Sequence, residues 1–312
     1  MAKILITEHI DPVGISLLEA AGHELVYMET RQPEELAAKM KDADVVLVRI
    51  LDIPAAAIEG SESLMLISKH GVGVDNIDLQ AAKKKGVAVT ITPGANSRAV
   101  AEHTMTLMLA LAKSLIYTDR QYKEIGFAAK NCPPGMEISG KTLGIIGCGR
   151  IGSQVACMAH LGFGMRVLAY DPYVEQVPEG VRLTESLEEL LAESDVVTLH
   201  CLLNEETNGI LGEKELAMMK PSAFLINCGR GPLIDEEALI RALEGGKLAG
   251  AGLDVTMKEP CDPDSPLFTL PNVILTPHFA PTTVEAAKAV SRIAAENIID
   301  YLAGKEIAGR IV

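Results

Sequence analysis

The chain has 312 residues, of which 48% are hydrophobic, and a formal net charge of −14. At about 150 residues per domain, this length predicts two domains that each bury a full core. Glycine (27) and proline (16) are too few for low-complexity disorder, and no apolar run approaches the roughly 20 residues needed to span a bilayer. So acidic a chain repels phosphate backbones and anionic lipid, which argues against nucleic-acid and membrane-surface partners.

The amino-terminal residues predict a strand and not a signal peptide, because Glu8 and His9 interrupt a short apolar run. The six cysteines form no CxxC pair, and no cluster of cysteine and histidine has metal-ligand spacing. Scattered thiols of this kind are typical of a reducing cytosol. We therefore expect a cytoplasmic protein without a metal site.

The amino-terminal part of the chain alternates short apolar runs with amphipathic stretches. The runs are rich in Val, Ile and Leu without clean alternation, which is typical of strands covered on both faces. The predicted strands are Lys3–Thr7, Glu24–Met28, Val45–Arg49, Leu64–Lys69 and Val87–Ile91, and the predicted helices are Pro12–Ala21, Pro33–Lys41 and Leu79–Lys85. Pro12 and Pro33 suit the first helical turn, and Asp11 suits an N-cap. Repeated β-α-β order predicts a parallel sheet with right-handed crossovers.

From Ser97 to about Ile125 apolar residues recur at helical spacing, which predicts one long buried helix. A loop over Gly126–Gly140 follows. A second alternating series then supplies six strands, as a complete dinucleotide-binding sheet requires. These strands are Leu143–Ile146, Val167–Tyr170, Val196–Leu199, Ala223–Cys228, Gly250–Val255 and Val273–Thr276. A final helix spans Thr282–Leu302, with a capping box predicted in Thr282–Glu285.

Gly147, Gly149 and Gly152 have the spacing GxGxxG between an apolar strand and a helical stretch. A further strand ends at Asp171, 19 residues after the last of these glycines. In a dinucleotide site the first glycine allows a tight turn, the second lets backbone approach a pyrophosphate, and the third lets helix pack on strand. Amides at the helix N-terminus would face the anion. The alternative is a structural turn in which Asp171 caps a loop before Pro172.

The same carboxylate bears on which cofactor binds. In a dinucleotide site Asp171 would accept hydrogen bonds from the adenosine ribose hydroxyls. It would repel the 2′-phosphate of NADP, and no Arg immediately follows it. The sequence therefore favours NAD over NADP.

Three further polar residues follow predicted strands. Arg230 lies between two glycines, Glu259 precedes a proline, and His278 follows a proline. Taken singly, each has a structural explanation: an Arg bound to a helix end or a surface acid, a solvated loop Glu, and a satisfied structural His. Taken together they suit one chemistry, because ligands of open α/β sheets bind at the carboxyl ends of strands.

In that chemistry, an Arg at position 230 holds a carboxylate and polarises the adjacent carbonyl. His278 gives or takes the hydroxyl proton near neutral pH, and Glu259 beside it stabilises the imidazolium and orients the ring. Hydride transfer itself belongs to a nicotinamide. The sequence thus predicts an NAD-dependent oxidoreductase.

Over essentially its whole length the chain resembles the D-isomer-specific 2-hydroxyacid dehydrogenases, and within them a D-3-phosphoglycerate dehydrogenase-like branch without a regulatory domain. The resemblance rests on Gly71–Asp78, on the GxGxxG turn with its acidic partner, and on the three polar segments. It implies a catalytic triad of Arg230, Glu259 and His278, and a homodimer. It also implies an α/β fold with two doubly wound parallel-sheet domains, in which a Rossmann NAD domain (98–283) is inserted into a flavodoxin-like substrate domain (1–97 and 284–312).

The resemblance further implies individual ligand contacts. Besides the three glycines, the cofactor contacts map onto Val72, Arg150, Ile151, Asp171, Cys201, Thr207, Cys228, Arg230, Asp254, His278 and Ala280. The backbone of Lys69, His70, Gly71, Val72 and Gly73 resembles the family's substrate-carboxylate loop, which acts with Arg230.

The sequence leaves the substrate open. A phosphorylated or sulfonated substrate needs a second anion site, for which Arg49, Lys69 and His70 are candidates; alternatively, the first two are solvated charges at strand ends. A 3-phosphoglycerate-like substrate is favoured, with hydroxypyruvate or glyoxylate reduction and a sulfolactate-type dehydrogenase as alternatives. An NADH-sensing corepressor-like binding protein is the alternative of another class. Formate dehydrogenase is disfavoured, because that activity resembles a site with Gln where Glu259 stands.

Overall fold

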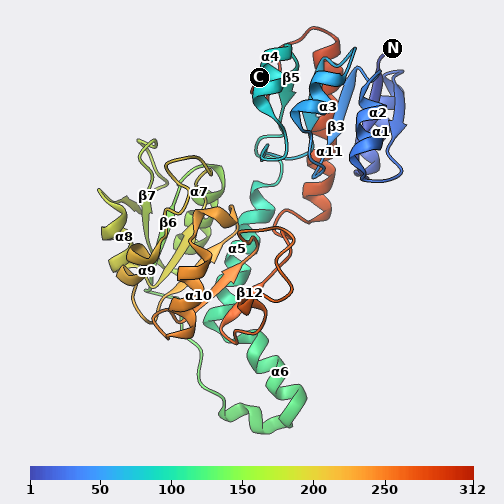
Figure 1. The fold of residues 1–312 in the computed structure, drawn as a ribbon. Coiled ribbons are helices and arrows are strands. Elements are labelled where there is room, and N and C mark those ends of the chain that lie inside the picture. Colours follow the sequence, from blue (N-terminus) through green and yellow to red (C-terminus); the bar gives the residue numbers. More distant parts are fainter. The chain divides into compact units, whose positions relative to one another are not determined.

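The computed structural model describes all 312 residues, which form two compact units (Figure 1). Unit 1 consists of Met1–Asn96 and Thr282–Val312, and unit 2 consists of Ser97–Pro281. The chain therefore leaves unit 1, builds the whole of unit 2, and returns to unit 1 for its last helix.

Unit 1 is built on a five-stranded parallel sheet with the strand order β2-β1-β3-β4-β5. Its strands are β1 (Lys3–Ile6), β2 (Glu24–Tyr27), β3 (Val45–Val48), β4 (Leu66–Lys69) and β5 (Ala88–Thr90). This is the flavodoxin-like order, in which the winding reverses between β1 and β3. It confirms the predicted fold class for this part of the chain.

Helices cover both faces of the unit 1 sheet. They are α1 (Pro12–Ala20), α2 (Pro33–Met40), α3 (Ala55–Gly60), α4 (Leu79–Lys85) and α11 (Val284–Leu302). Alternate strand residues pack against α2, α3 and α4 on one face and against α1 and α11 on the other, which explains the continuous apolar runs. The sequence analysis did not predict the short helix α3.

The helix starts of unit 1 test two cap predictions. Asp11 caps α1 by accepting a hydrogen bond from the Val13 amide, as predicted. The capping box predicted for the last helix is wrong, because Thr283 is the N-cap and accepts from the Ala286 amide. Glu285 then lies one position too early to reach back to the cap amide.

Unit 2 contains a seven-stranded parallel sheet with the order β12-β11-β10-β9-β6-β7-β8. Its strands are β6 (Thr142–Ile146), β7 (Arg166–Tyr170), β8 (Val181–Leu183), β9 (Val196–Leu199), β10 (Phe224–Asn227), β11 (Gly250–Leu253) and β12 (Val273–Leu275). The winding reverses between β6 and β9, as in a Rossmann sheet with one added strand, which confirms the fold class predicted for unit 2.

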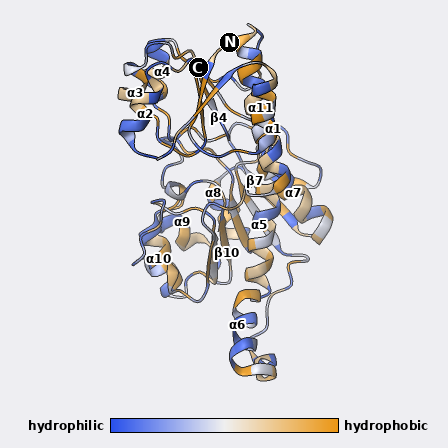
Figure 2. Ribbon diagram, turned by 90° about the vertical axis from the view of Figure 1, so that its right-hand side faces the viewer, coloured by the Kyte–Doolittle hydropathy of each residue, from blue (hydrophilic) through white to orange (hydrophobic).

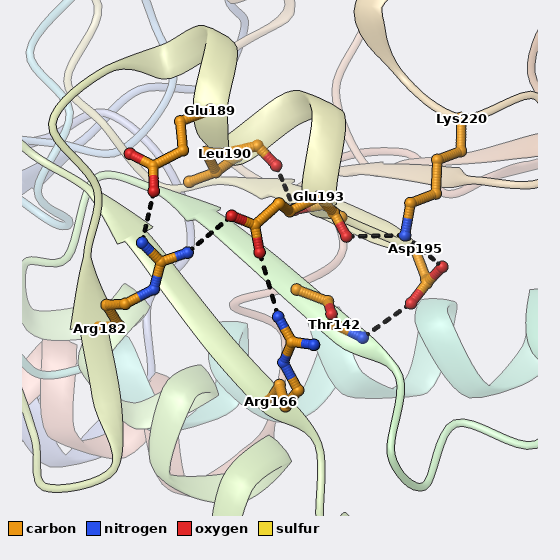
Figure 3. Close-up of polar contacts among 9 residues, drawn as sticks. Thr142, Arg166, Arg182, Glu189, Leu190, Glu193, Asp195 and Lys220 are labelled. Atoms are coloured by element: carbon orange, nitrogen blue, oxygen red, sulfur yellow. Dashed lines mark hydrogen bonds and ion pairs between the residues drawn. The ribbon is translucent and has the colours of Figure 1, made fainter.

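The edge strand β8 was not predicted, because it is short and only half-buried. Arg182 of this strand donates to Glu189 and Glu193 of helix α8 (Leu187–Glu193), and Arg166 of β7 donates to the same Glu193 (Figure 3). Lys220 and the Thr142 amide both bond Asp195 beside this cluster (Figure 3). These contacts secure β8 and α8 at the amino-terminal side of the sheet, away from the strand ends that carry the predicted site.

The predicted long helix from Ser97 to about Ile125 is wrong in its middle. It is two helices, α5 (Ser97–Ala112) and α6 (Leu115–Ile125), and the segment 115–131 is bent by 51° from α5. Ser114 has a left-handed φ of 49°, and the Met136 amide bonds the last carbonyl of α5 at 2.6 Å. Helix α5 is largely buried, whereas α6 has no buried residue and projects away from the sheet (Figure 1).

The other helices of unit 2 follow its strands in turn. They are α7 (Arg150–Cys157), α9 (Glu213–Met218) and α10 (Glu236–Glu244), and the predicted loop after α6 contains a 3₁₀ segment, Gly126–Asn131. No helix by itself has the length and apolarity to cross a membrane; α5 with 115–131 meets those criteria only as a bent pair.

Candidate active site

The glycine turn lies between the end of β6 and the start of α7. A Cβ on Gly147 would lie 2.4 Å from the Cys201 amide nitrogen, and one on Gly152 would lie 2.2 Å from the Gly147 carbonyl oxygen, so both positions require glycine. A Cβ on Gly149 would meet no heavy atom within 4 Å. The second glycine therefore faces open space at the helix N-terminus, where the amides can approach a pyrophosphate.

Asp171 directly follows β7, and its carboxylate is turned toward the glycine turn. One oxygen accepts from the Cys148 amide at 2.8 Å, and the other accepts from the Tyr173 amide at 3.0 Å. A carboxylate has about four acceptor positions, so this one has capacity left for ribose hydroxyls. Asp171 therefore caps its own loop, as the structural alternative expects, and it keeps acceptor positions that a dinucleotide could use. These residues fit NAD.

The other predicted cofactor contacts in unit 2 lie along the same carboxyl edge of its sheet. Arg150 and Ile151 begin α7, whereas Val72 belongs to unit 1. The remaining positions follow β9, β10, β11 and β12, and they are Cys201, Thr207, Cys228, Asp254 and Ala280. Burial raises the pKa of Cys201 to about 11 and that of Cys228 to about 12, so both are thiols without nucleophilic character near neutral pH.

His278 and Glu259 form a hydrogen-bonded pair. The His278 Nδ1 atom lies 2.8 Å from Glu259 Oε2, and the two side chains are 44% and 42% exposed, so a ligand can reach them. Because a carboxylate only accepts, Nδ1 carries the hydrogen and Nε2 is left for another partner. His278 has a left-handed φ of 52°, so a specific backbone conformation aims its ring.

Arg230 follows β10 in a loop that is tied to the loop after β11. The Asn227 side chain donates to the Arg230 carbonyl and accepts from the Gly229 amide, both at 2.9 Å. A Cβ on Gly231 would lie 1.8 Å from the Thr256 carbonyl oxygen, so glycine is required for the two loops to pack. Since β10, β11 and β12 are neighbours, this places Arg230, Glu259 and His278 on three adjacent loops.

The candidate substrate residues of unit 1 are not equivalent. Lys69 is only 7% exposed, and its ammonium group donates to the Arg49 carbonyl at 2.5 Å and to Asn76 Oδ1 at 2.6 Å. Arg49 itself is exposed. Burial, assisted by the Arg49 charge, lowers the pKa of His70 to about 4. His70 is therefore neutral near pH 7 and adds no positive charge to an anion site.

Sequence reasoning missed the group that arranges this loop. The Glu8 carboxylate accepts from the amides of Arg49, Ile50 and Leu51, each at 2.8 Å, and from the Thr7 hydroxyl at 2.5 Å. Burial raises the pKa of Glu8, but the hydroxyl and the amides together bring it below its ordinary value. An acidic residue after the first strand was the only sequence signal, and it was used only against a signal peptide.

Comparisons with known proteins agree with this geometry. Residues 105–280 match the family model described as D-isomer specific 2-hydroxyacid dehydrogenase, NAD binding domain, and this range lies within unit 2. The chain is 45% identical to a D-3-phosphoglycerate dehydrogenase of Methanocaldococcus jannaschii, with 100% of this chain and 59% of that protein covered. It is 38% identical to a glyoxylate reductase of Korarchaeum cryptofilum, with 97% and 93% covered.

Among solved structures, the TT0316 protein from Thermus thermophilus superposes with a TM-score of 0.92 at 36% identity, covering 99% of this chain and 100% of that one. The chain spans 59% of the length of the Methanocaldococcus relative and nearly all of the other two. These matches confirm the resemblance to the D-isomer-specific 2-hydroxyacid dehydrogenases inferred from the sequence, and NAD as the cofactor. The chain belongs to the D-isomer specific 2-hydroxyacid dehydrogenase family.

Proposed function

We propose that the chain interconverts a D-2-hydroxy acid and its 2-keto acid by NAD-dependent hydride transfer. The observation that carries this proposal is the His278–Glu259 pair, at 2.8 Å, on the same sheet edge as the glycine turn. A 2-hydroxy acid offers one hydroxyl proton and one carboxylate, and the three adjacent loops supply an acid/base and a cation for them. The nicotinamide supplies the hydride exchange when bound.

Each residue has a distinct role. His278 takes the hydroxyl proton at Nε2 in oxidation and returns it in reduction, because Nδ1 is engaged by Glu259. Glu259 holds the ring in place and stabilises the imidazolium. Arg230 binds the substrate carboxylate and polarises the carbonyl. We assign the backbone of Lys69–Gly73 in unit 1 to the same carboxylate, and Asp171 to selection of NAD over NADP.

The substrate proposed first is a 3-phosphoglycerate-like acid. Arg49 supports it, because this exposed guanidinium stands at the end of β3, where a second anion would need a cation. A glyoxylate or hydroxypyruvate reductase is the second candidate. Two observations favour this second candidate. The Glu8 carboxylate already accepts from the amides of residues 49 to 51, so these amides are not left for a second anion. The Lys69 ammonium group is likewise bonded within the loop, to the Arg49 carbonyl.

A panel of 2-keto acids tests both candidates. Phosphohydroxypyruvate, hydroxypyruvate and glyoxylate are compared by kcat/KM with NADH, and each is repeated with NADPH. The first candidate requires phosphohydroxypyruvate to give the highest value, whereas a preference for glyoxylate or hydroxypyruvate establishes the second. Absence of turnover with every acid, together with tight NADH binding, would contradict an enzyme and favour a binding protein.

We also propose a homodimer formed through the exposed face of α6. Its large apolar side chains are exposed by 41% to 59%, and Phe127 just beyond the helix by 76%. They are Leu115, Ile116, Tyr117, Tyr122 and Ile125. Figure 2 shows apolar segments alternating with polar ones along α6, and none of its residues is buried within the chain, so these side chains are available to a partner. Light scattering should give twice the 33.2 kDa chain mass, and Ile125→Asp should give the monomer.

The six cysteines are all free, which supports a reducing compartment, and we propose the cytoplasm. Fractionation of the source cells with an antibody against the chain tests this assignment. Recovery in an oxidising compartment would contradict it.

A further inference from the structure

Asp254 directly follows β11 and holds the segment that carries His278. Its side chain is 1% exposed, and its carboxylate accepts from the Phe279 amide at 2.7 Å and from the Ala280 amide at 2.9 Å. Its own carbonyl accepts from the His278 amide at 2.7 Å. One residue therefore binds three consecutive amides at the point where the backbone of His278 is left-handed.

Two more side chains complete the arrangement. Thr276 directly follows β12, and its hydroxyl donates to Asp254 Oδ1 at 2.5 Å. His103 of α5 places Nε2 3.0 Å from that hydroxyl and 3.5 Å from Asp254 Oδ1. The His103 ring also meets the Phe279 ring edge-on, with centroids 6.5 Å apart. The arrangement thus joins α5 to the residues on both sides of His278.

The direction of these hydrogen bonds follows from the donor count. Thr276 has one hydroxyl hydrogen, and Asp254 takes it, because an ionised carboxylate can only accept. The Thr276 oxygen must then accept from His103, so Nε2 of His103 carries a hydrogen. The order is His103 to Thr276 to Asp254, and no other order satisfies all three groups.

We propose that His103 and Thr276 are positioning residues for the reaction, an inference that rests on the proposed role of His278. They act through the Asp254 carboxylate, which they hold in the orientation that binds the amides of Phe279 and Ala280, directly after His278. Without them the carboxylate can rotate, the His278 backbone relaxes from its left-handed conformation, and the ring leaves the geometry needed at the substrate hydroxyl. Neither side chain touches the reacting atoms.

The test uses single-turnover oxidation of enzyme-bound NADH at 340 nm, with glyoxylate and with phosphohydroxypyruvate. Thr276→Val removes the hydroxyl at nearly constant volume and should slow hydride transfer about ten- to hundredfold, as misplaced catalytic groups do. KM and the Kd for NADH should change far less. Thr276→Ser keeps the hydroxyl and should restore the rate. His103→Leu should match Thr276→Val, and His103→Gln, which keeps a donor, should recover part of the loss.

The matched control is Thr198→Val. Thr198 is a buried threonine of β9 whose hydroxyl lies 3.0 Å from His200 Nε2, so the variant also breaks a threonine–histidine pair, at a place unconnected to His278. It should lose similar stability and keep the wild-type rate. If Thr276→Val does not fold, the His103→Leu and His103→Gln pair carries the test by itself.

His278→Ala separates the two claims. If it is slow while Thr276→Val and His103→Leu turn over at the wild-type rate, or no more slowly than Thr198→Val, the positioning role is wrong and the proposed function stands. If His278→Ala itself keeps the wild-type rate, the proposed role of His278 is wrong and the inference falls with it.

Discussion

The carboxyl edges of the two parallel sheets have features in common and differ in what they expose. In unit 1, Glu8 accepts three consecutive amides, and in unit 2, Asp254 accepts those of Phe279 and Ala280. In each unit a histidine directly follows a strand and keeps one buried ring nitrogen without a hydrogen-bond partner: Nε2 of His70 and Nδ1 of His200.

Only the edge of unit 2 adds an exposed acid/base pair and a turn that opens on free space. A carboxylate that binds successive amides therefore fixes a loop in either sheet, and it does not by itself indicate chemistry. Chemistry is indicated where a titratable side chain is both held and reachable, as His278 is. This difference supports the proposal that the reaction takes place at the edge of unit 2.

Removing the acid/base should have the largest effect. His278→Ala should lower kcat by about 10²–10⁴-fold, the usual contribution of a general acid–base group, and leave the Kd for NADH nearly unchanged. Steady-state kinetics and fluorescence titration measure the two quantities. His9→Ala, an exposed histidine of unit 1, is the control and should behave as wild type. Loss of NADH binding in step with kcat would make His278 a binding residue.

The buried histidines should make stability depend on pH. The pKa of His70 is lowered to about 4, so the folded state keeps this ring neutral while the unfolded state takes up a proton as the pH falls below about 6.5. The contribution of the neutral His70 ring to the free energy of unfolding is complete above pH 6.5 and is lost progressively as the pH falls to 4. It amounts to about 3 kcal/mol. Burial lowers the pKa of His200 to about 3, so this histidine changes the stability in the same direction.

Urea unfolding at pH 7 and pH 4.5 measures this loss. His70→Asn should lose less free energy of unfolding than the wild type between the two values, because it has no ring to protonate. Equal losses in the two proteins would show that His70 takes up a proton as readily in the folded state as in the unfolded state, and would contradict its lowered pKa.

Arg49→Ala tests whether the edge of unit 1 recognises a second anion. A hydrogen bond to a charged group is worth about 1.5–3 kcal/mol, so KM for phosphohydroxypyruvate should rise roughly ten- to hundredfold, and KM for glyoxylate should hardly change. Added salt should weaken the phosphorylated substrate more than the short one. A uniform effect on both acids, or none, would mean that Arg49 is a solvated charge at a strand end.

Asp171→Ala should have the smallest effect. The variant loses hydrogen bonds to the ribose and also removes repulsion of a 2′-phosphate, so the ratio of kcat/KM for NADH over NADPH should narrow. The carboxylate also accepts from the Cys148 and Tyr173 amides, so Asp171→Asn is the better variant if the loop loses order. A wild-type ratio in both variants would assign cofactor choice to other residues.

Sequence patterns predicted the parts of the fold that depend on local chemistry. The strand Val196–Leu199 and the GxGxxG turn appear where the pattern placed them, because apolar runs and required glycines are local signals. The break between α5 and α6 was missed, because it depends on Met136, which lies far along the chain from Ser114. The same holds for His103, whose partner Thr276 is 173 residues away.

The rate of keto-acid reduction by Glu259→Gln tests the central claim, that unit 2 holds a reachable acid/base pair, most directly. In the wild type, the Glu259 carboxylate lies 2.8 Å from His278 Nδ1 and orients the ring that carries the proton. Gln keeps the size and an oxygen acceptor but removes the charge, and a charged acceptor makes a hydrogen bond roughly twice as strong as a neutral one, so kcat should fall about tenfold while the Kd for NADH stays at the wild-type value. A wild-type kcat would exclude Glu259 from this role and contradict the account.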